Sequence, residues 1–173
     1  MNIRSATPAD ASALLSIYAH YVVNTAITFE LTVPSVDDFR HKMEQTLQRF
    51  PYLVAEDDAG NIMGYCYAST FRPRHAYDHC VEMSIYIAPN CRRSGIGSML
   101  YSELEPRLRA MGIINLCASI TLCDHPSPYV DDQSMRFHEK HGYRKVAHFH
   151  KCGHKFNDWF DMIWMEKFIA EHR

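Results

Sequence analysis

A glutamate, two arginines and two glycines fall within one short stretch of this 173-residue chain. The stretch runs from Val81 to Tyr101 and reads as a β-rich segment, a Pro-Asn turn, and a basic, glycine-bearing loop that opens an amphipathic helix. Backbone N–H groups at a helix start, beside Arg92 and Arg93, form a site for an anion. Glu82, on the preceding strand, would place a base close to whatever that anion carries.

The loop has the spacing Arg92-x-x-Gly95-x-Gly97. Alone, this pattern is a weak signal, since a surface turn with a glycine near a helix start is common. Its place between a strand and a helix raises its specificity, and it lacks both the Lys-Ser/Thr pair of a Walker loop and the third glycine of a dinucleotide fingerprint. Successive N–H groups from residue 93 to residue 98 would cradle a pyrophosphate, because glycines allow close backbone approach.

Patterns of apolar residues predict the elements that hold this stretch in place. Helices are expected over residues 7–24, from residue 35, from the glycine loop to residue 111, and over 134–141. Strands are expected over 52–56, 62–69, 79–87, 113–122, 143–150 and 159–168. The apolar run at 113–122 is typical of a buried parallel strand. The last two strands are expected to form an antiparallel pair. Pro106 is expected to kink or break its helix. This order predicts a three-layer α/β or α+β domain around a mixed sheet.

Composition narrows the function classes. Apolar residues make up 47% of the chain, charged residues 22%, and the net charge of −2 gives no global basic field for nucleic acid or a membrane. No apolar run approaches the roughly 20 residues of a spanning helix, and the N-terminus lacks the apolar core of a signal peptide. We therefore expect one cytoplasmic domain over residues 1–173, with its six cysteines free.

Several further motifs follow in order along nearly the whole chain. They are Ile17-Tyr18-Ala19-His20-Tyr21-Val22, Thr28-Phe29-Glu30, Phe71-Arg72-Pro73-Arg74-His75-Ala76-Tyr77, Val81-Glu82-Met83-Ser84-Ile85-Tyr86-Ile87 and Lys155-Phe156-Asn157-Asp158-Trp159-Phe160-Asp161. Together with the glycine loop, they resemble the GNAT superfamily of N-acetyltransferases, and within it the phosphinothricin and methionine sulfoximine acetyltransferase group. The GNAT pyrophosphate motif is Arg/Gln-x-x-Gly-x-Gly/Ala, which this loop matches.

The resemblance implies a mostly antiparallel twisted sheet whose central strands splay apart. Acetyl-CoA would lie as cosubstrate in the splay between the strands at 79–87 and 113–122. Main-chain groups of residues 85–87 would pair with it, and a bulge near 84–86 would aim an amide at the acetyl carbonyl. The cofactor-binding residues implied are Ile85, Tyr86, Ile87, Arg92, Arg93, Ser94, Gly95, Ile96, Gly97, Ser98 and Ser134.

The implied activity is direct transfer of an acetyl group to the amine of a small amino-acid-like substrate, such as phosphinothricin or methionine sulfoximine. An ammonium with a pKa of about 10 is mostly charged at neutral pH, so a base assists attack. We expect Glu82 to act as this base through a water; the alternative is a salt bridge to Arg72 or Arg74. His138, where many relatives carry tyrosine, is a candidate for the general acid; the alternatives are that it contacts the CoA sulfur region or packs under its helix.

The expected substrate-binding residues are Phe29, Glu30, Arg72, Arg74 and Tyr77. Guanidinium groups suit a carboxylate or phosphinate, and Glu30 would pair with an ammonium. The alternatives are a solvated arginine loop and a helix-start acid. An acetyltransferase for another amine (a protein N-terminus, a polyamine or an aminoglycoside) and a non-catalytic acyl-CoA sensor also remain open. The resemblance further implies a homodimer.

Two features depart from the simplest interpretation. Relatives carry Asn-x-x-Ser before the penultimate helix, whereas Asp131 holds the asparagine position here and would repel CoA phosphates. His148, His150, Cys152 and His154 alternate, and on a continuous strand they would present zinc-type ligands on one face. Because Gly153 is expected to break that strand and the spacing fits no common zinc pattern, no metal is assigned.

Overall fold

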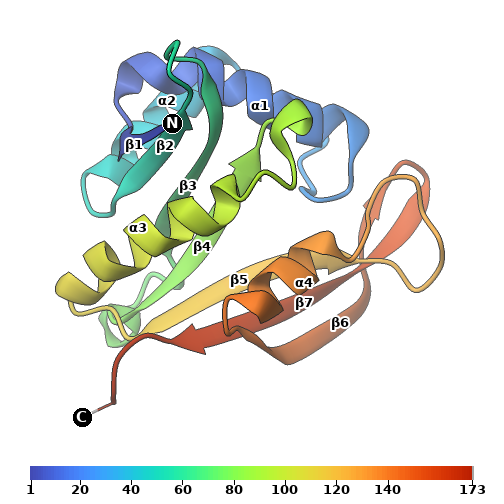
Figure 1. Cartoon of the computed structure of the whole chain (residues 1–173). Coiled ribbons are helices and arrows are strands. Elements are labelled where there is room, and N and C mark those ends of the chain that lie inside the picture. Colours follow the sequence, from blue (N-terminus) through green and yellow to red (C-terminus); the bar gives the residue numbers. More distant parts are fainter. Residues whose placement is uncertain (173) are drawn as a thin grey trace.

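The structure is a computed structural model that describes residues 1–172 (Figure 1). The strands are β1 (Asn2–Ser5), β2 (Tyr52–Glu56), β3 (Ile62–Thr70), β4 (Cys80–Ile87), β5 (Asn115–Leu122), β6 (Arg144–Lys155) and β7 (Asp158–Phe168). The helices are α1 (Ala11–Asn24), α2 (Val36–Leu47), α3 (Ile96–Ala110) and α4 (Gln133–Lys140). The elements expected from the sequence are present, so the three-layer α/β architecture is confirmed.

Side-chain caps explain where the first helices begin. Thr7 and Asp10 form a capping box, in which the Thr7 N–H donates to Asp10 Oδ2 at 2.8 Å. Ser35 caps α2 by accepting from the Asp38 N–H at 3.1 Å. The capping box belongs to a 3-10 turn, Pro8–Asp10, that leads directly into α1, so the helical segment begins where predicted but its α-helical part starts at Ala11. The start of α2 after Ser35 agrees with the prediction.

The seven strands form one sheet in the order β1-β2-β3-β4-β5-β7-β6. Neighbours are antiparallel except for β4 and β5, which run parallel as predicted. The parallel ladder has only three residue pairs and ends at Glu82 opposite Cys117. Beyond that point β4 stays paired with β3 and β5 with β7, so the sheet divides (Figure 1). The predicted splay is therefore present.

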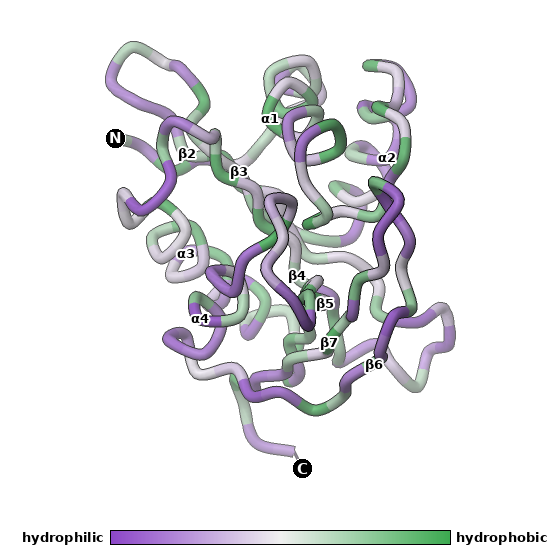
Figure 2. Tube along the Cα trace, turned by 90° about the vertical axis from the view of Figure 1, so that its right-hand side faces the viewer, coloured by the Kyte–Doolittle hydropathy of each residue, from purple (hydrophilic) through white to green (hydrophobic). Residues whose placement is uncertain are grey.

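Helices cover both faces of the sheet and close two apolar cores. On one face α3 packs on β2, β3 and β4, and its buried residues include Leu100, Leu104 and Leu108. On the other face α1 and α2 enclose a core that contains Leu14, Met43 and several tyrosines. Figure 2 shows green and purple segments alternating along the helices and purple, hydrophilic segments along much of β6. The first core also holds the two halves of the divided sheet together, because it contains residues of β3 and β4 as well as of β5 and β7.

Two expectations fail for identifiable reasons, and one strand was not expected. Pro106 does not break α3, because it lies on the exposed side, where water can satisfy the carbonyl that its missing N–H leaves free. Gly153 does not end β6, because a bulge between Phe149 and Gly153, with Lys151 at a φ of 48°, lets pairing resume. The sequence analysis also missed β1, a short edge strand defined by its pairing with β2.

Two negative findings concern the described residues. Across residues 1–172, no helix is both long and apolar enough to cross a membrane. All six cysteines carry free thiols, as predicted, and the nearest two, Cys80 and Cys117, bring their sulfur atoms to 3.6 Å across β4 and β5.

Candidate active site

The start of α3 presents free backbone donors beside the splay. Gly95, at the N-cap, has a φ of 82°, and Arg93 has a φ of 63°, so the loop turns through conformations that aim consecutive N–H groups to one side. No side chain caps this helix. The N–H groups of its first residues, Ile96, Gly97 and Ser98, therefore lack intrahelical acceptors and can receive an anion.

These donors face a cavity of about 460 Å³, which we call the glycine-loop cavity. Its lining residues are Tyr21, Ile27, Ile85, Ile87, Cys91, Arg92, Arg93, Ser94, Gly95, Ile96, Gly97, Ser98, Gln133, Ser134, Arg136, Phe137 and Lys140. Every residue predicted to bind the cofactor lines it except Tyr86. Of the five α4 residues in this lining, only Ser134 was predicted; Gln133, Arg136, Phe137 and Lys140 were missed, because only the packing of α3 against α4 brings them here. A Cβ at Gly97 would lie 3.0 Å from Phe137 Cε2, so the glycine permits that close packing.

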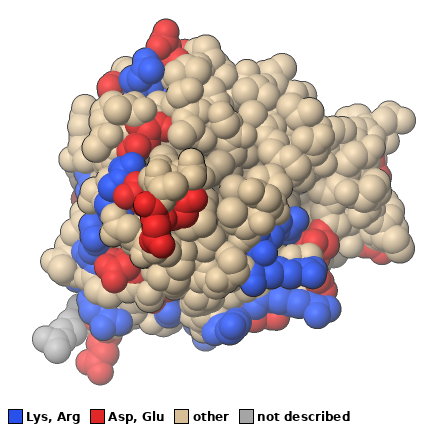
Figure 3. Space-filling model, turned by 45° about the horizontal axis from the view of Figure 1, so that its top comes forward, with Lys and Arg blue, Asp and Glu red and all other residues tan. Residues whose placement is uncertain are grey.

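Basic side chains surround the glycine-loop cavity, contributed by Arg92, Arg93, Arg136 and Lys140. Lys and Arg side chains gather at the lower right of the view in Figure 3. Apolar walls from Ile85, Ile87 and Phe137 complete the cavity. This combination of cations, free N–H groups and an apolar wall suits a long ligand with a phosphorylated end and an uncharged arm.

Asp131 does not line the glycine-loop cavity. It accepts the Gln133 N–H at 3.0 Å and the Gln133 side-chain amide at 2.6 Å, which fixes the start of α4. Its charged partner is Arg92, whose guanidinium lies 3.8 Å from Asp131 Oδ2. Asp131 therefore opposes anion binding less than its position in the sequence implies, because its charge is directed to Arg92 and its hydrogen bonds go to Gln133.

Main-chain groups on β4 face the splay at alternate residues. The Ala88 N–H donates to Met63 O at 2.8 Å, so in an antiparallel pair the groups of Tyr86 and Ser84 also point to β3. The N–H and C=O groups of Ile85 and Ile87 therefore point to the opposite side, toward β5, which has already diverged from β4 at these residues. The register from Thr70/Val81 to Gly64/Ile87 is continuous, so the expected bulge near residues 84–86 is wrong. Divergence of β5 exposes the amides instead.

A second cavity, of about 290 Å³, lies on the other side of the splay, and we call it the Glu82 cavity. Its lining residues are Ile27, Thr28, Phe29, Glu82, Met83, Ser84, Ile85, Tyr86, Ala118, Ser119, Thr121, Ser134, His138, Met162 and Trp164. Glu82 is half-buried and accepts the Ser119 hydroxyl at 2.8 Å. It forms no ion pair with an arginine anywhere in residues 1–172, so the structure does not contain the alternative salt bridge to Arg72 or Arg74.

The two cavities adjoin through shared walls. Ile27, Ile85 and Ser134 line both of them. A ligand in the glycine-loop cavity can therefore extend its uncharged end through the splay toward Glu82. Glu82 is the one Asp, Glu, Lys or Arg among the described residues that line the second cavity, so an ammonium is the charged group best matched to that cavity.

The predicted substrate residues do not all meet. Phe29 lines the Glu82 cavity, whereas Glu30 lines a separate hollow beside α2. Arg72 and Tyr77 line a third cavity, and Trp164 separates it from the second by lining both. The Arg72 guanidinium lies 4.6 Å from the Phe71 ring centroid and 5.8 Å from that of Trp164. Arg74 is exposed and lines none of these cavities.

His138 is buried, and both of its ring nitrogens have partners. Nδ1 lies 2.8 Å from Ser134 O, which can only accept, so Nδ1 carries the proton and Nε2 accepts from the Tyr101 hydroxyl at 3.0 Å. Burial lowers the pKa of His138 to about 4. A neutral imidazole whose single N–H is donated to Ser134 O is a poor proton donor for a thiolate at neutral pH. The structure therefore opposes the predicted acid role and supports the alternative, packing beneath α4.

Phe29 reaches the Glu82 cavity by lying flat against Gly153 of β6. A Cβ at Gly153 would overlap the Phe29 ring, so only glycine leaves room for it. We expect Gly153→Ala to push the ring into or out of the cavity and to lower kcat/KM for the amine substrate roughly 10- to 100-fold, because small misplacements at a reacting centre have such effects. Steady-state kinetics with the amine varied would measure this.

A double mutant separates this effect from general damage to β6. In the Phe29→Ala background the overlap is gone, so adding Gly153→Ala should change kcat/KM little. An equal loss in both backgrounds would show that Gly153 acts without Phe29.

Comparisons with known proteins agree with this geometry. The model of the Acetyltransferase (GNAT) domain family matches residues 3–164. A phosphinothricin N-acetyltransferase of Streptomyces viridochromogenes is 32% identical over 169 residues, which cover 97% of this chain and 88% of that protein. An L-methionine sulfoximine/L-methionine sulfone acetyltransferase of Pseudomonas aeruginosa is 31% identical, with 95% and 92% covered. The crystal structure of a GNAT superfamily phosphinothricin acetyltransferase from Sinorhizobium meliloti in complex with AcCoA superposes with a TM-score of 0.88 at 34% identity, covering 96% of this chain and 87% of that one.

Proposed function

The chain belongs to the GNAT family of acetyltransferases, which use acetyl-CoA, and from this premise we propose that it acetylates the amine of a small amino-acid-like substrate by direct attack. Phosphinothricin and methionine sulfoximine are the substrates named for its relatives. The main support for this proposal is that two cavities adjoin at the splay. One is lined by free N–H groups and cations, and the other is lined by Glu82. In this proposal residues 1–173 act as one acetyltransferase domain.

The glycine-loop cavity fits the donor. The N–H groups of Ile96, Gly97 and Ser98, together with Arg92 and Arg93, would bind the pyrophosphate. Main-chain groups of Ile85 and Ile87 would bind the uncharged arm, replacing the ladder that β5 no longer provides. When bound, acetyl-CoA supplies an acetyl group activated as a thioester.

Glu82 would prepare the acceptor. Its carboxylate attracts the substrate ammonium and takes a proton from it, directly or through one water, which frees the nitrogen lone pair for attack. The Ser119 hydroxyl holds one carboxylate oxygen at 2.8 Å and leaves the other free to face the cavity. Phe29, Met162 and Trp164 provide apolar walls that restrict the amine to one approach.

The lining of the Glu82 cavity favours a compact substrate with one ammonium. Its volume of about 290 Å³ and its single acidic residue suit an amino acid better than a polyamine or an aminoglycoside, which would need several carboxylates. Hydroxyl groups of Ser84, Ser119 and Thr121 are available to the other polar atoms of the substrate. For Arg72 to reach an anionic group, that group would have to extend past Trp164.

The test is release of free CoA thiol from acetyl-CoA across a panel of amines. The panel contains amino acids, phosphinothricin, methionine sulfoximine, a polyamine, an aminoglycoside and a peptide with a free N-terminus. We expect turnover with an amino-acid analogue. Turnover with polyamine alone would contradict the substrate class, and tight acetyl-CoA binding without turnover of any amine would favour a sensor.

We also propose a homodimer that covers the third cavity. Tyr77, Val146 and Phe149 line this cavity of about 660 Å³ and are 40%, 50% and 48% exposed, a concentration of apolar surface next to Trp164. Sedimentation of the wild-type chain should give the mass of two copies, and Phe149→Glu should give that of one. A wild-type monomer would contradict the proposal.

A further inference from the structure

Three side chains outside both reaction cavities converge where β6 bulges over β7. His148 and His150 come from β6 and Asp161 from β7, and one ligand atom from each lies within 4.8 Å of the others. His148 Nε2 is 2.7 Å from Asp161 Oδ2, and His150 Nδ1 is 3.2 Å from the same oxygen. The imidazole rings stack with centroids 4.0 Å apart. Two ring nitrogens therefore meet one carboxylate oxygen, within the spacing that the ligands of one ion would have.

The carboxylate of this cluster is held rigidly. Asp161 is 4% exposed, and its Oδ1 accepts the Lys151 N–H at 2.8 Å, a bond made possible by the positive φ of Lys151 in the bulge. A buried carboxylate that is oriented by a second hydrogen bond behind it is a usual form of metal ligand.

We propose that His148, His150 and Asp161 bind a divalent transition-metal ion, with solvent completing the coordination. Two imidazoles and one carboxylate form a ligand set that takes zinc, cobalt, nickel or copper. In a tetrahedral site with bonds near 2.0–2.1 Å, ligand atoms lie about 3.3 Å apart. The distance of 3.2 Å between His150 Nδ1 and Asp161 Oδ2 is already close to this spacing. His148 reaches that spacing by moving outward roughly half an ångström, and both imidazoles lie toward solvent, with side chains 28% and 74% exposed.

The ion would replace the N–H protons that both imidazoles now direct at Oδ2. It would tie the bulge of β6 to β7 and stabilise the chain, as any ligand specific for the folded state does. The ion would lie outside the proposed reaction site, because none of its three ligands lines the Glu82 cavity. The alternating set in the sequence therefore contributes only two members: Cys152 is exposed, and His154 packs on Trp159 with ring centroids 4.8 Å apart.

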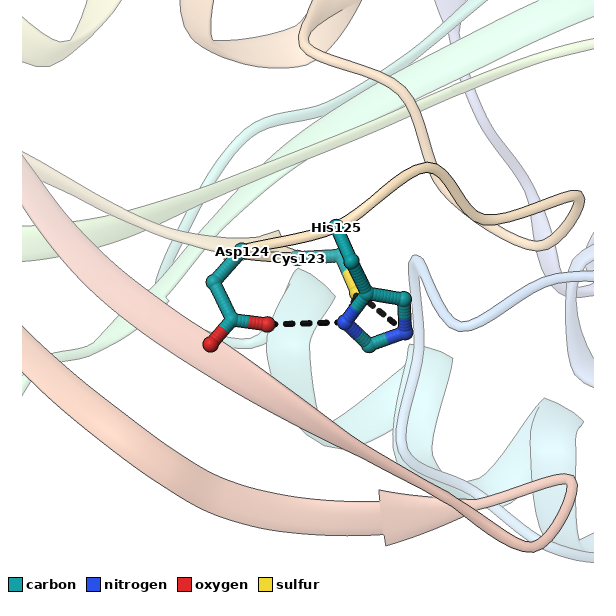
Figure 4. Close-up of side chains that lie close together, drawn as sticks. All are labelled: Cys123, Asp124 and His125. Atoms are coloured by element: carbon teal, nitrogen blue, oxygen red, sulfur yellow. Dashed lines mark hydrogen bonds and ion pairs between the residues drawn. The ribbon is translucent and has the colours of Figure 1, made fainter.

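A neighbouring cluster of Cys123, Asp124 and His125 is the rival site (Figure 4). There the histidine lies between two carboxylates, with Nδ1 2.7 Å from Asp124 and Nε2 3.0 Å from Asp158. These carboxylates, Asp124 first, raise the pKa of His125. The Cys123 sulfur lies 3.4 Å from both ring nitrogens, but those nitrogens are engaged by two different acids, and all three side chains come from consecutive residues of one exposed loop. We therefore assign the ion to the His148 cluster.

The experiment is titration of tag-free, metal-free protein with Zn²⁺ by isothermal calorimetry, followed by the absorption spectrum with Co²⁺. We expect about one ion per chain and a rise in the melting temperature. His150→Ala, a change at an exposed position, should weaken binding by about tenfold or more, since even losses behind the ligands cost that much. His154→Ala, on the same strand but outside the cluster, should leave affinity unchanged.

The cobalt spectrum discriminates between the two clusters. Ligands from two histidines and an aspartate give no thiolate-to-cobalt charge-transfer band, whereas coordination by Cys123 gives one. Equal binding by wild type and His150→Ala, or a thiolate band that Cys123→Ser abolishes, would overturn the proposal. None of these readouts depends on acetyl transfer, so the result stands whether or not the proposed activity is found.

Discussion

Glu82→Gln should lower kcat by about 100-fold or more, while acetyl-CoA binds as before. The amide cannot accept the ammonium proton, yet it preserves the size of the side chain and can still contact Ser119. Acetyl-CoA affinity should not change, because Glu82 lines only the second cavity. The deficit should shrink as pH rises toward the pKa of the amine, about 10, where the substrate deprotonates without help. Stopped-assay kinetics at several pH values measure kcat, and calorimetry measures the affinity for acetyl-CoA.

Glu56→Gln is the matched control. Glu56 is also a carboxylate on a sheet strand, but it pairs with Arg4 at 2.8 Å, far from either cavity in the sheet order. Its replacement should leave kcat unchanged. If Glu82→Gln retains full turnover at neutral pH, the base assignment is wrong, and water alone must deprotonate the amine.

His138 should make the protein less stable as pH falls from about 6.5 to about 4. The pKa of the folded state, about 4, lies below the unfolded value of 6.5, so the unfolded chain takes up this proton first. Above pH 6.5 both states are neutral and the group contributes no pH dependence. The loss accumulated by about pH 4 is on the order of 3 kcal/mol, from the size of the pKa difference. Chemical denaturation at several pH values gives this slope.

His138→Asn isolates the contribution of this one group. The asparagine amide can still donate to Ser134 O but does not titrate, so the variant should be less stable at pH 7 and show a shallower loss between pH 6.5 and 4. Subtracting the two profiles removes the acid sensitivity of carboxylates such as Asp10, whose pKa the Arg4 hydrogen bond lowers. Parallel profiles would mean that His138 is not neutral in the fold.

Features encoded locally could be predicted from the sequence. The glycine loop and the start of α3 are contiguous, so residues 92–98 were placed correctly against one cavity before any packing was known. The unbroken apolar run of β5 identified the single parallel pairing, and the resemblance supplied the splay. These features depend on chain order and backbone conformation, both of which sequence motifs report directly.

Features set by packing could not be predicted. Phe137 and Arg136 line the glycine-loop cavity because Gly97 lets α4 approach α3. The two residues in contact, Gly97 and Phe137, are 40 positions apart in the chain. Trp164 separates Arg72 from Glu82, although both lie in neighbouring motifs. The contacts of the His138 nitrogens with Tyr101 and Ser134 O argue against the acid role, and they form only once α3 and α4 are in place.

Direct transfer between the two adjoining cavities is the central claim, and intact-protein mass spectrometry tests it most directly. The protein is incubated with acetyl-CoA alone and then with methionine sulfoximine added. We predict that the mass of the chain stays unchanged in both samples, and that the N-acetylated amine accumulates only in the second. A chain that gains one acetyl group without amine, and loses it when amine is added, would contradict direct attack.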